Sequence, residues 1–237
     1  LRAVTEGPCS STSLAARFLI GDPVPGGVLR GIDGLSFHHG KFAFGGLAAP
    51  DLLSCCVFTH GIYTDTRGAL ELVADTNTAI PGGVGFFTQF SAAWLYDDVV
   101  VFRALGQNNQ DGIYAWSDGV LRRVADTTNS VPGGSGQFVN FGFVLNDAFG
   151  SLLFGWPVSA DGIVLFQGSG SDGEKGIYKE VNNSLEVVAD LTTPIPGGTG
   201  NFTGFDDSVT AGNTEDGVIV FVGKGSIAPG GVVPQRG

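Results

Sequence analysis

The chain has no methionine, few cysteines, few cations and no long apolar run. Its 237 residues include 12 Lys and Arg against 23 Asp and Glu, which gives a net charge of −11. Nucleic-acid binding needs a basic footprint, so this balance argues against it. No apolar run approaches the roughly 18 residues of a membrane-spanning helix, so we expect no transmembrane segment. The acidic balance favours solubility, or a cationic or metal partner, without selecting one.

Only three cysteines are present, at Cys9, Cys55 and Cys56. An odd number leaves two interpretations open: Cys9 is bridged to Cys55 or Cys56, or all three are buried, inert thiols. Asn182 and Asn201 each open an Asn-x-Ser/Thr pattern, which is the acceptor for N-glycosylation. The chain begins Leu-Arg-Ala, which fits a removed targeting sequence or a cropped chain. We expect an extracytoplasmic location: secreted, at the cell surface or in an organelle lumen.

What the chain does contain is a repeated phrase that ends in Pro-Gly-Gly. Residues 73–83 read VADTNTAIPGG, residues 124–134 VADTTNSVPGG and residues 188–198 VADLTTPIPGG, and a shortened copy, LIGDPVPGG, lies at 19–27. Each full copy is preceded by Gly-Ile-Tyr and followed by Phe-x-x-Phe. One supersecondary unit has therefore been copied along the chain. A motif present in every unit is more typical of a scaffold than of an active site.

Residues 86–126 show the unit most clearly, as four short β-rich runs separated by Gly, Asn and Asp turns. This pattern is typical of consecutive antiparallel strands, and four-stranded repeats of this length indicate propeller blades. We predict an all-β, β-propeller-like single domain over residues 1–237 with about four four-stranded antiparallel blades. The units are approximately 19–75, 76–126, 127–190 and 191–237, named units one to four, and the last is incomplete. The array is either a ring closed by both chain ends or, as we favour, a segment of a longer propeller.

The repeat VADTxTxIPGGxGxFxxF, followed by a Val-x-Phe strand and Gly-Ile-Tyr, resembles an uncharacterised family of secreted tandem-repeat proteins from bacteria and some algae. The resemblance covers roughly residues 14–237. It implies a propeller-like fold and export from the cytoplasm, and members often carry C-terminal surface-sorting anchors. It implies no catalytic residues, because no activity is established for the family. Unit one departs from the pattern, since Leu29 and Ile32 replace its Phe-x-x-Phe, and we interpret it as an end cap or an edge.

Function is best sought where a unit departs from the repeat, because insertions map to loops. Unit three carries an apolar insertion within 148–158, which forms a hairpin or flap that covers a blade face or offers a patch to a protein partner. The second-to-third strand loops are also long in unit one (46–61) and unit four (223–237). The candidate partner-binding residues in the insertion are Phe149, Leu152, Leu153, Phe154 and Trp156.

Candidates for chemistry are weaker. Asp75, Asp126 and Asp190 recur in the blade-crossing loops and could form an acidic ring around a channel that binds Ca²⁺ or a cationic ligand, but no Ca²⁺-loop motif accompanies them. We expect them to hold their own turns, and we predict no cofactor or metal. His38, His39 and His60 lack a metal-site spacing, so we predict solvated turns for them. No nucleophile, zinc-protease or phosphate-loop motif is present, which predicts a chain that is not an enzyme.

The leading hypothesis is a non-enzymatic interaction or scaffold module that binds a protein or a larger assembly, for example as an accessory subunit of a membrane-associated complex. The first alternative is a glycan- or small-ligand-binding propeller that uses Trp94, Trp116 or Trp156 as a stacking platform, although we expect Trp116 to pack between blades. The second alternative is a propeller-fold hydrolase or lyase.

Overall fold

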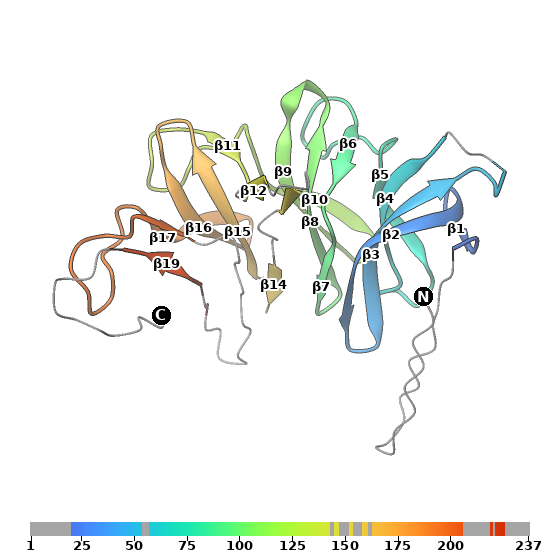
Figure 1. Cartoon of the computed structure of the whole chain (residues 1–237), viewed down its shortest axis with the longest axis horizontal. Helices are drawn as coiled ribbons and strands as arrows, with labels where there is room; N and C mark the ends of the chain where they lie inside the picture. The colour runs from blue at the N-terminus through green and yellow to red at the C-terminus, as the bar shows by residue number, and fades with distance from the viewer. Residues whose placement is uncertain are drawn as a thin grey trace, which may run out of the picture.

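The computed structural model describes residues 20–53, 57–142, 145–146, 152–153, 158–160, 163–205, 219 and 221–225. Within these residues the fold is built from antiparallel strands and one short 3-10 helix, η1 (Gln107–Asn109). The all-β prediction is confirmed. Three larger sheets follow one another along the chain and lie in an open row (Figure 1).

The strands of each sheet are nearly in chain order. Sheet one contains β1 (Pro23–Val24), β2 (Gly27–His38), β3 (Lys41–Ala49), β4 (Thr59–Thr64) and β5 (Glu71–Asp75). Sheet two contains β6 (Phe87–Phe90), β7 (Trp94–Tyr96), β8 (Val99–Gly106), β9 (Asp111–Ser117) and β10 (Val120–Asp126). Sheet three contains β11 (Phe138–Asn140), β14 (Val158–Ala160), β15 (Ile163–Gly170), β16 (Lys175–Val181) and β17 (Ser184–Asp190). Two small pairs complete the description: β12 (Leu145–Asn146) with β13 (Leu152–Leu153), and β18 (Gly204–Phe205) with β19 (Gly223–Lys224).

The predicted first strand of unit two, Phe86–Tyr96, is broken in its middle. β6 and β7 both pair with β8, and residues 91–93 interrupt them. The break lies at Ser91, whose hydroxyl accepts from the Arg103 amide at 3.0 Å in place of a backbone carbonyl. Sheet three repeats the break, since β11 and β14 both pair with β15. The insertion of unit three therefore lies inside a divided first strand.

Each full copy of Pro-Gly-Gly lies between the last strand of one sheet and the next sheet, as the sequence predicts, whereas Pro25-Gly26-Gly27 of the shortened copy connects β1 to β2 within sheet one. The amides of Gly83, Gly134 and Gly198 donate to the carbonyls three residues earlier. The middle glycine of each turn is left-handed, with φ of 67° at Gly82, and Pro precedes it. This is a type II turn, which requires φ > 0 at its third residue.

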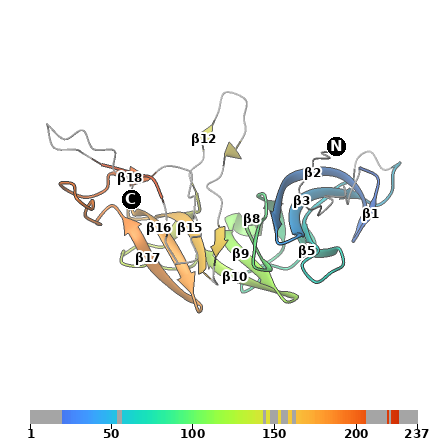
Figure 2. The same ribbon diagram turned by 90° about the horizontal axis from the view of Figure 1, so that it is seen from below.

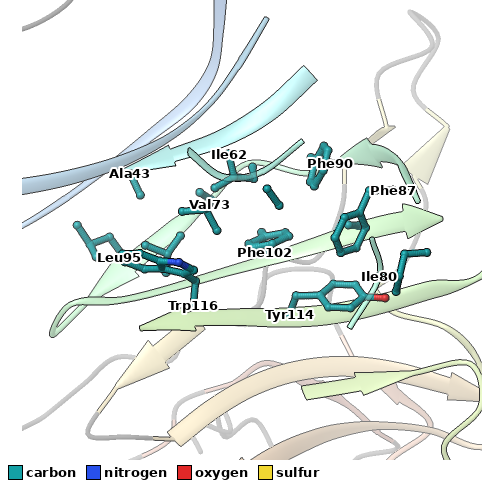
Figure 3. Packing of buried hydrophobic residues seen from close by; sticks show 14 residues of the cluster. Ala43, Ile62, Val73, Ile80, Phe87, Phe90, Leu95, Phe102, Tyr114 and Trp116 are labelled. Atoms are coloured by element: carbon teal, nitrogen blue, oxygen red, sulfur yellow. The ribbon is translucent and has the colours of Figure 1, made fainter. Parts of the chain in front are cut away.

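Adjacent sheets stack face to face through apolar layers. Figure 3 shows the layer between sheets one and two, where Ala43, Ile62 and Val73 of sheet one meet Phe87, Phe90, Phe102, Tyr114 and Trp116 of sheet two. The layer between sheets two and three repeats the aromatic set with Phe138, Phe141, Phe166 and Tyr178. The Phe-x-x-Phe and Gly-Ile-Tyr motifs therefore build one recurring aromatic cluster. In sheet two the Tyr114 ring meets the Phe87 ring edge to face, with 4.8 Å between ring centroids, and in sheet three Tyr178 meets Phe138 in the same way at 5.0 Å.

Sheet one differs from the other two because it curls into a half-barrel (Figure 2). β2 is twelve residues long and its register with β3 shifts twice, between Leu29 and Gly31 and between Asp33 and Leu35. Such irregularities bend a strand and increase its twist. The curl encloses a separate apolar cluster that contains Leu29, Phe44 and Tyr63. Unit one thus buries on itself the face that sheets two and three offer to the preceding sheet.

Candidate functional site

Several predicted site residues lie outside the described part of the chain. These are Phe149, Phe154 and Trp156 of the insertion, and Cys9, Cys55 and Cys56. Leu152 and Leu153 form β13, which pairs with β12, and Figure 2 shows β12 standing to one side of the three sheets. The glycosylation candidates Asn182 and Asn201 are both exposed.

The three recurring aspartates bind their own loops. Asp75 Oδ1 accepts from the Asn77 amide at 2.9 Å, and Asp190 Oδ1 accepts from the Thr192 amide at the same distance. In unit two the Thr128 amide donates to Asp126 Oδ1, again at 2.9 Å. Each carboxylate therefore holds the first turn of a blade-crossing loop.

Asp126 is the most constrained of the three, because its side chain is completely buried. Its Oδ2 accepts from Gln110 Nε2 at 2.9 Å and from Arg123 Nη1 at 2.8 Å. Burial alone would raise the pKa of Asp126, but the hydrogen bonds from Thr128 and Arg123 outweigh burial and hold this pKa below its ordinary value. The carboxylate is thus kept ionised as a structural anion.

A pocket of about 310 Å³ opens where β4 of sheet one meets the break in the first strand of sheet two. Its lining residues are His60, Gln89, Phe90, Ser91, Arg103, Ala104 and Leu105. The Arg103 guanidinium makes a two-pronged contact with the Asp111 carboxylate at 2.8 and 2.7 Å, and both side chains are buried. A buried guanidinium held in this way is a rigid element of the pocket wall.

His60 also faces a carboxylate, with its Nε2 lying 3.3 Å from Asp33 Oδ2. Burial lowers the pKa of His60 below its ordinary value, and the Asp33 charge opposes this shift without reversing it. The prediction of a solvated turn for His60 is wrong, since this residue lies within β4, where it pairs with Leu47 of β3, and lines the pocket.

The tips of two neighbouring hairpins bring His38, His39 and Asp97 together; we name these three residues the hairpin-tip cluster. One ligand-type atom from each side chain lies within 4.8 Å of the others. The Nδ1 atoms of His38 and His39 lie 3.6 and 3.8 Å from Asp97 Oδ1. His39 is a solvated turn residue, as predicted, whereas His38 is only 20% exposed and stacks on Tyr96.

The tryptophans offer no exposed stacking platform within the described residues. Trp116 is buried in the layer between sheets one and two, which confirms its predicted place. Trp94 is half-buried and packs against the apolar cluster of sheet three.

Exposed apolar side chains gather on unit one. Of the thirteen large hydrophobic residues exposed in the described part of the chain, eight belong to this unit: Ile20, Ile32, Leu35, Phe37, Leu52, Leu53, Val57 and Phe58. Leu53, at 92% exposure, lies in the long loop between β3 and β4.

The sequence alone does not reveal the hairpin-tip cluster or the Arg103–Asp111 pair. An alignment of equivalent turns could have indicated the cluster. His39-Gly40 connects β2 to β3, and Asp97-Asp98 connects the equivalent strands β7 and β8 of the next unit. For the pair, the signal was Arg103 itself, which stands where units one and three have Gly45 and Gln167.

Comparison with known families finds a match. A family model described as "Family of unknown function (DUF7453)" matches residues 37–170, which is more than half of the chain. The chain belongs to the DUF7453 family. The match covers both hairpin tips and the pocket of this DUF7453 chain. No curated protein and no solved structure matches significantly. In the part of the chain that the structure describes, no helix has the length and apolar character needed to cross a bilayer.

Proposed function

We propose that this chain is a non-enzymatic interaction module that acts outside the cytoplasm and binds a protein partner through loops particular to single units. The stacked sheets are its blades, in a propeller or a segment of one. Support comes from the division of roles along the chain, since the repeated motifs build the apolar layers and the crossing turns. The repeated residues are thus occupied by the scaffold, and the unit-specific residues are available for binding.

The main support for this protein-binding function is the loop between β3 and β4. It spans residues 50–58, whereas the equivalent connections are 107–110 in unit two and 171–174 in unit three. Leu52, Leu53, Val57 and Phe58 are all exposed on it, and Leu52 lies beside Gly21 near exposed Ile20. The equivalent connections carry polar residues, QNNQ and SDGE. Clustered exposed hydrophobic side chains mark protein-interaction sites.

The test uses a photo-crosslinking amino acid placed at Leu53 in the whole protein, with the same amino acid at Val120 as a control. Val120 is an exposed hydrophobic residue on β10, away from the loop. We expect Leu53 to cross-link a specific protein that Val120 does not. Binding of that protein should fall more than about tenfold in the variant Leu53→Ser/Phe58→Ser, because anchor residues of interfaces contribute about 2 kcal/mol or more.

A variant with Val120→Ser and Val139→Ser should bind the partner like the unchanged protein. Equal cross-linking from both positions, or unchanged binding by Leu53→Ser/Phe58→Ser, would show that the loop is not the binding surface. The insertion at 148–158 remains a second predicted surface on the same module.

A glycan- or small-ligand-binding function is the second candidate, favoured by the pocket of about 310 Å³. Phe90 offers a ring there, while His60, Gln89 and Arg103 offer polar atoms. Ligands of this type bind concave sites that combine apolar walls with a few fixed polar groups. Saccharide titrations that shift the backbone NMR signals of these residues selectively would favour this candidate over the protein partner.

A further inference from the structure

We propose that the hairpin-tip cluster of His38, His39 and Asp97 is a binding site for a divalent first-row transition ion such as Zn²⁺, which clips unit one to unit two. The two histidines come from the turn between β2 and β3, and the aspartate comes from the turn between β7 and β8. Their ligand-type atoms already converge within 4.8 Å. The inference is independent of the proposed protein-binding role.

The donor set suits such an ion. Two imidazole nitrogens and one carboxylate oxygen are typical ligands of zinc, at about 2.0–2.2 Å from the metal. Tetrahedral ligands at that radius lie about 3.4 Å from one another. The two Nδ1–Oδ1 distances of 3.6 and 3.8 Å therefore need only a small closure. Three protein ligands leave one tetrahedral position for water.

The backbone that carries these ligands is tightly constrained. Both turns are two-residue connections in the left-handed region, with φ of 47° at His39 and 44° at Asp97. The two tips are held together, because the Leu95 amide donates to Ser36 Oγ at 3.0 Å. The His38 ring stacks on the Tyr96 ring with 4.2 Å between centroids. Ligands on fixed elements lose little freedom on binding, which favours affinity.

Two polar contacts determine which groups face the site of the ion. Lys41 Nζ lies 2.6 Å from Asp98 Oδ2, which pairs Lys41 with Asp98 and leaves the Asp97 carboxylate facing the histidines. The Asp97 amide donates to His38 Nδ1 at 3.1 Å, so the lone pair of this nitrogen points at the Asp97 turn. When the ion binds His38 Nδ1, the metal–nitrogen bond replaces this hydrogen bond from the Asp97 amide. With neutral imidazoles, Asp97 supplies the negative charge that attracts a dication.

The histidines are particular to unit one. At the aligned positions of the sequence the other units have Asp97-Asp98, Asp161-Gly162 and Asp216-Gly217, which are residue types that favour two-residue turns. Unit one replaces them with His39-Gly40 after His38. The repeat thus provides the turn, and unit one alone adds imidazoles beside the carboxylate of the next unit.

The test is titration of the whole protein with Zn²⁺ by calorimetry, together with thermal unfolding. We expect one saturable site per chain and a higher unfolding midpoint with Zn²⁺. His39→Ala and Asp97→Asn should each weaken binding by more than about tenfold, since losing even a supporting partner of a ligand costs about that much. His60→Asn, a histidine variant outside the cluster, should leave Zn²⁺ binding unchanged.

Titration with Co²⁺ separates this site from the cysteines, because thiolate ligation gives an intense near-ultraviolet charge-transfer band. We expect visible d–d bands without that band. Circular dichroism of the metal-free variants should match that of the unchanged protein. The proposal is wrong if no saturable binding occurs, if His39→Ala and Asp97→Asn retain full affinity, or if the bound Co²⁺ shows thiolate charge transfer.

Discussion

At the scale of single residues, the recurring aspartates occupy the same position but different environments. All three hold the turn of their own loop, yet only Asp126 is fully buried and also accepts from Gln110 and Arg123. A buried carboxylate with several donors is costly to remove, because its partners lose their hydrogen bonds in a site that water cannot reach. Asp75 and Asp190 hold the same turn without full burial, so substitutions there measure the contribution of the turn to stability without that of the buried carboxylate.

We predict that Asp126→Ala lowers the free energy of unfolding by about 2–3 kcal/mol, and that Asp75→Ala lowers it less. Urea unfolding followed by circular dichroism measures both. The depressed pKa of Asp126 also sets a pH dependence, because its contribution is complete above the unfolded pKa of 3.8 and is lost as pH falls through the folded pKa. Asp126→Asn should therefore lose less stability than the unchanged protein during acidification below about pH 4. Identical acid profiles would contradict the assigned role.

At the scale of elements, the glycine of Gly-Ile-Tyr has a steric reason. A Cβ at Gly61, Gly112 or Gly176 would lie 2.9, 2.9 or 2.8 Å from a carbonyl oxygen of the neighbouring strand, which is β5, β10 or β17 respectively. In all three sheets the pairing of these two strands (β4 with β5, β9 with β10, β16 with β17) shifts register next to this point. The bulge brings the two backbones close together, and only glycine fits there.

We predict that Gly112→Ala destabilises the protein by about 1–3 kcal/mol, because overpacking forces the backbone apart. Gly31→Ala is the matched control, since Gly31 also lies in a strand but a Cβ there meets nothing nearer than 3.7 Å. Denaturant unfolding of the two variants decides the matter. Equal stabilities would show that the bulge adapts to a methyl group.

The elements that could be predicted from the sequence are those with local causes. The last three strands of each sheet (β3–β5, β8–β10 and β15–β17) follow from runs of Val, Ile and Phe between turn residues. The type II turns follow from Pro-Gly-Gly. The break at Ser91 could not be predicted, because it depends on a bond to Arg103 twelve residues away. The curl of sheet one depends on register shifts between β2 and β3, which hydrophobic alternation does not encode.

The candidate sites were harder to predict for the same reason. His38 and Asp97 are 59 residues apart in the chain, and only the stacking of sheets one and two brings their turns together. His60 has an apolar neighbourhood that its sequence context does not show. By contrast, the Oδ1 atoms of Asp75, Asp126 and Asp190 accept from amides two residues further along the chain, where local sequence is informative.

At the scale of the whole molecule, the sheets form a row in which each contacts mainly its neighbours. β7 of sheet two contacts both β2 of sheet one and β14 of sheet three, so one strand of the middle sheet touches both of its neighbours. Stability in such an array depends on the contacts within each unit and on each interface between neighbours. Polar contacts that cross an interface therefore test how tightly two units are coupled.

The contact best suited to that test joins sheet two to sheet three. Arg122 Nη2 on β10 lies 2.9 Å from Glu180 Oε2 on β16, and the Glu180 side chain is only 3% exposed. Glu180 Oε1 also accepts from the Asn183 amide, so the carboxylate is held in place when the arginine is removed. A buried carboxylate without its cation costs more than an exposed pair contributes.

We predict that Arg122→Met lowers the free energy of unfolding by about 1–3 kcal/mol, because the buried Glu180 carboxylate loses its cationic partner. Lys179→Met is the control, since Lys179 pairs with the half-exposed Glu186 of the adjacent strand β17 within sheet three, and it should have little effect. The double variant Arg122→Met/Glu180→Gln should recover part of the loss, and a double-mutant cycle in urea should give a coupling above about 0.5 kcal/mol. Additive effects of the two substitutions would mean that this pair does not hold units two and three together.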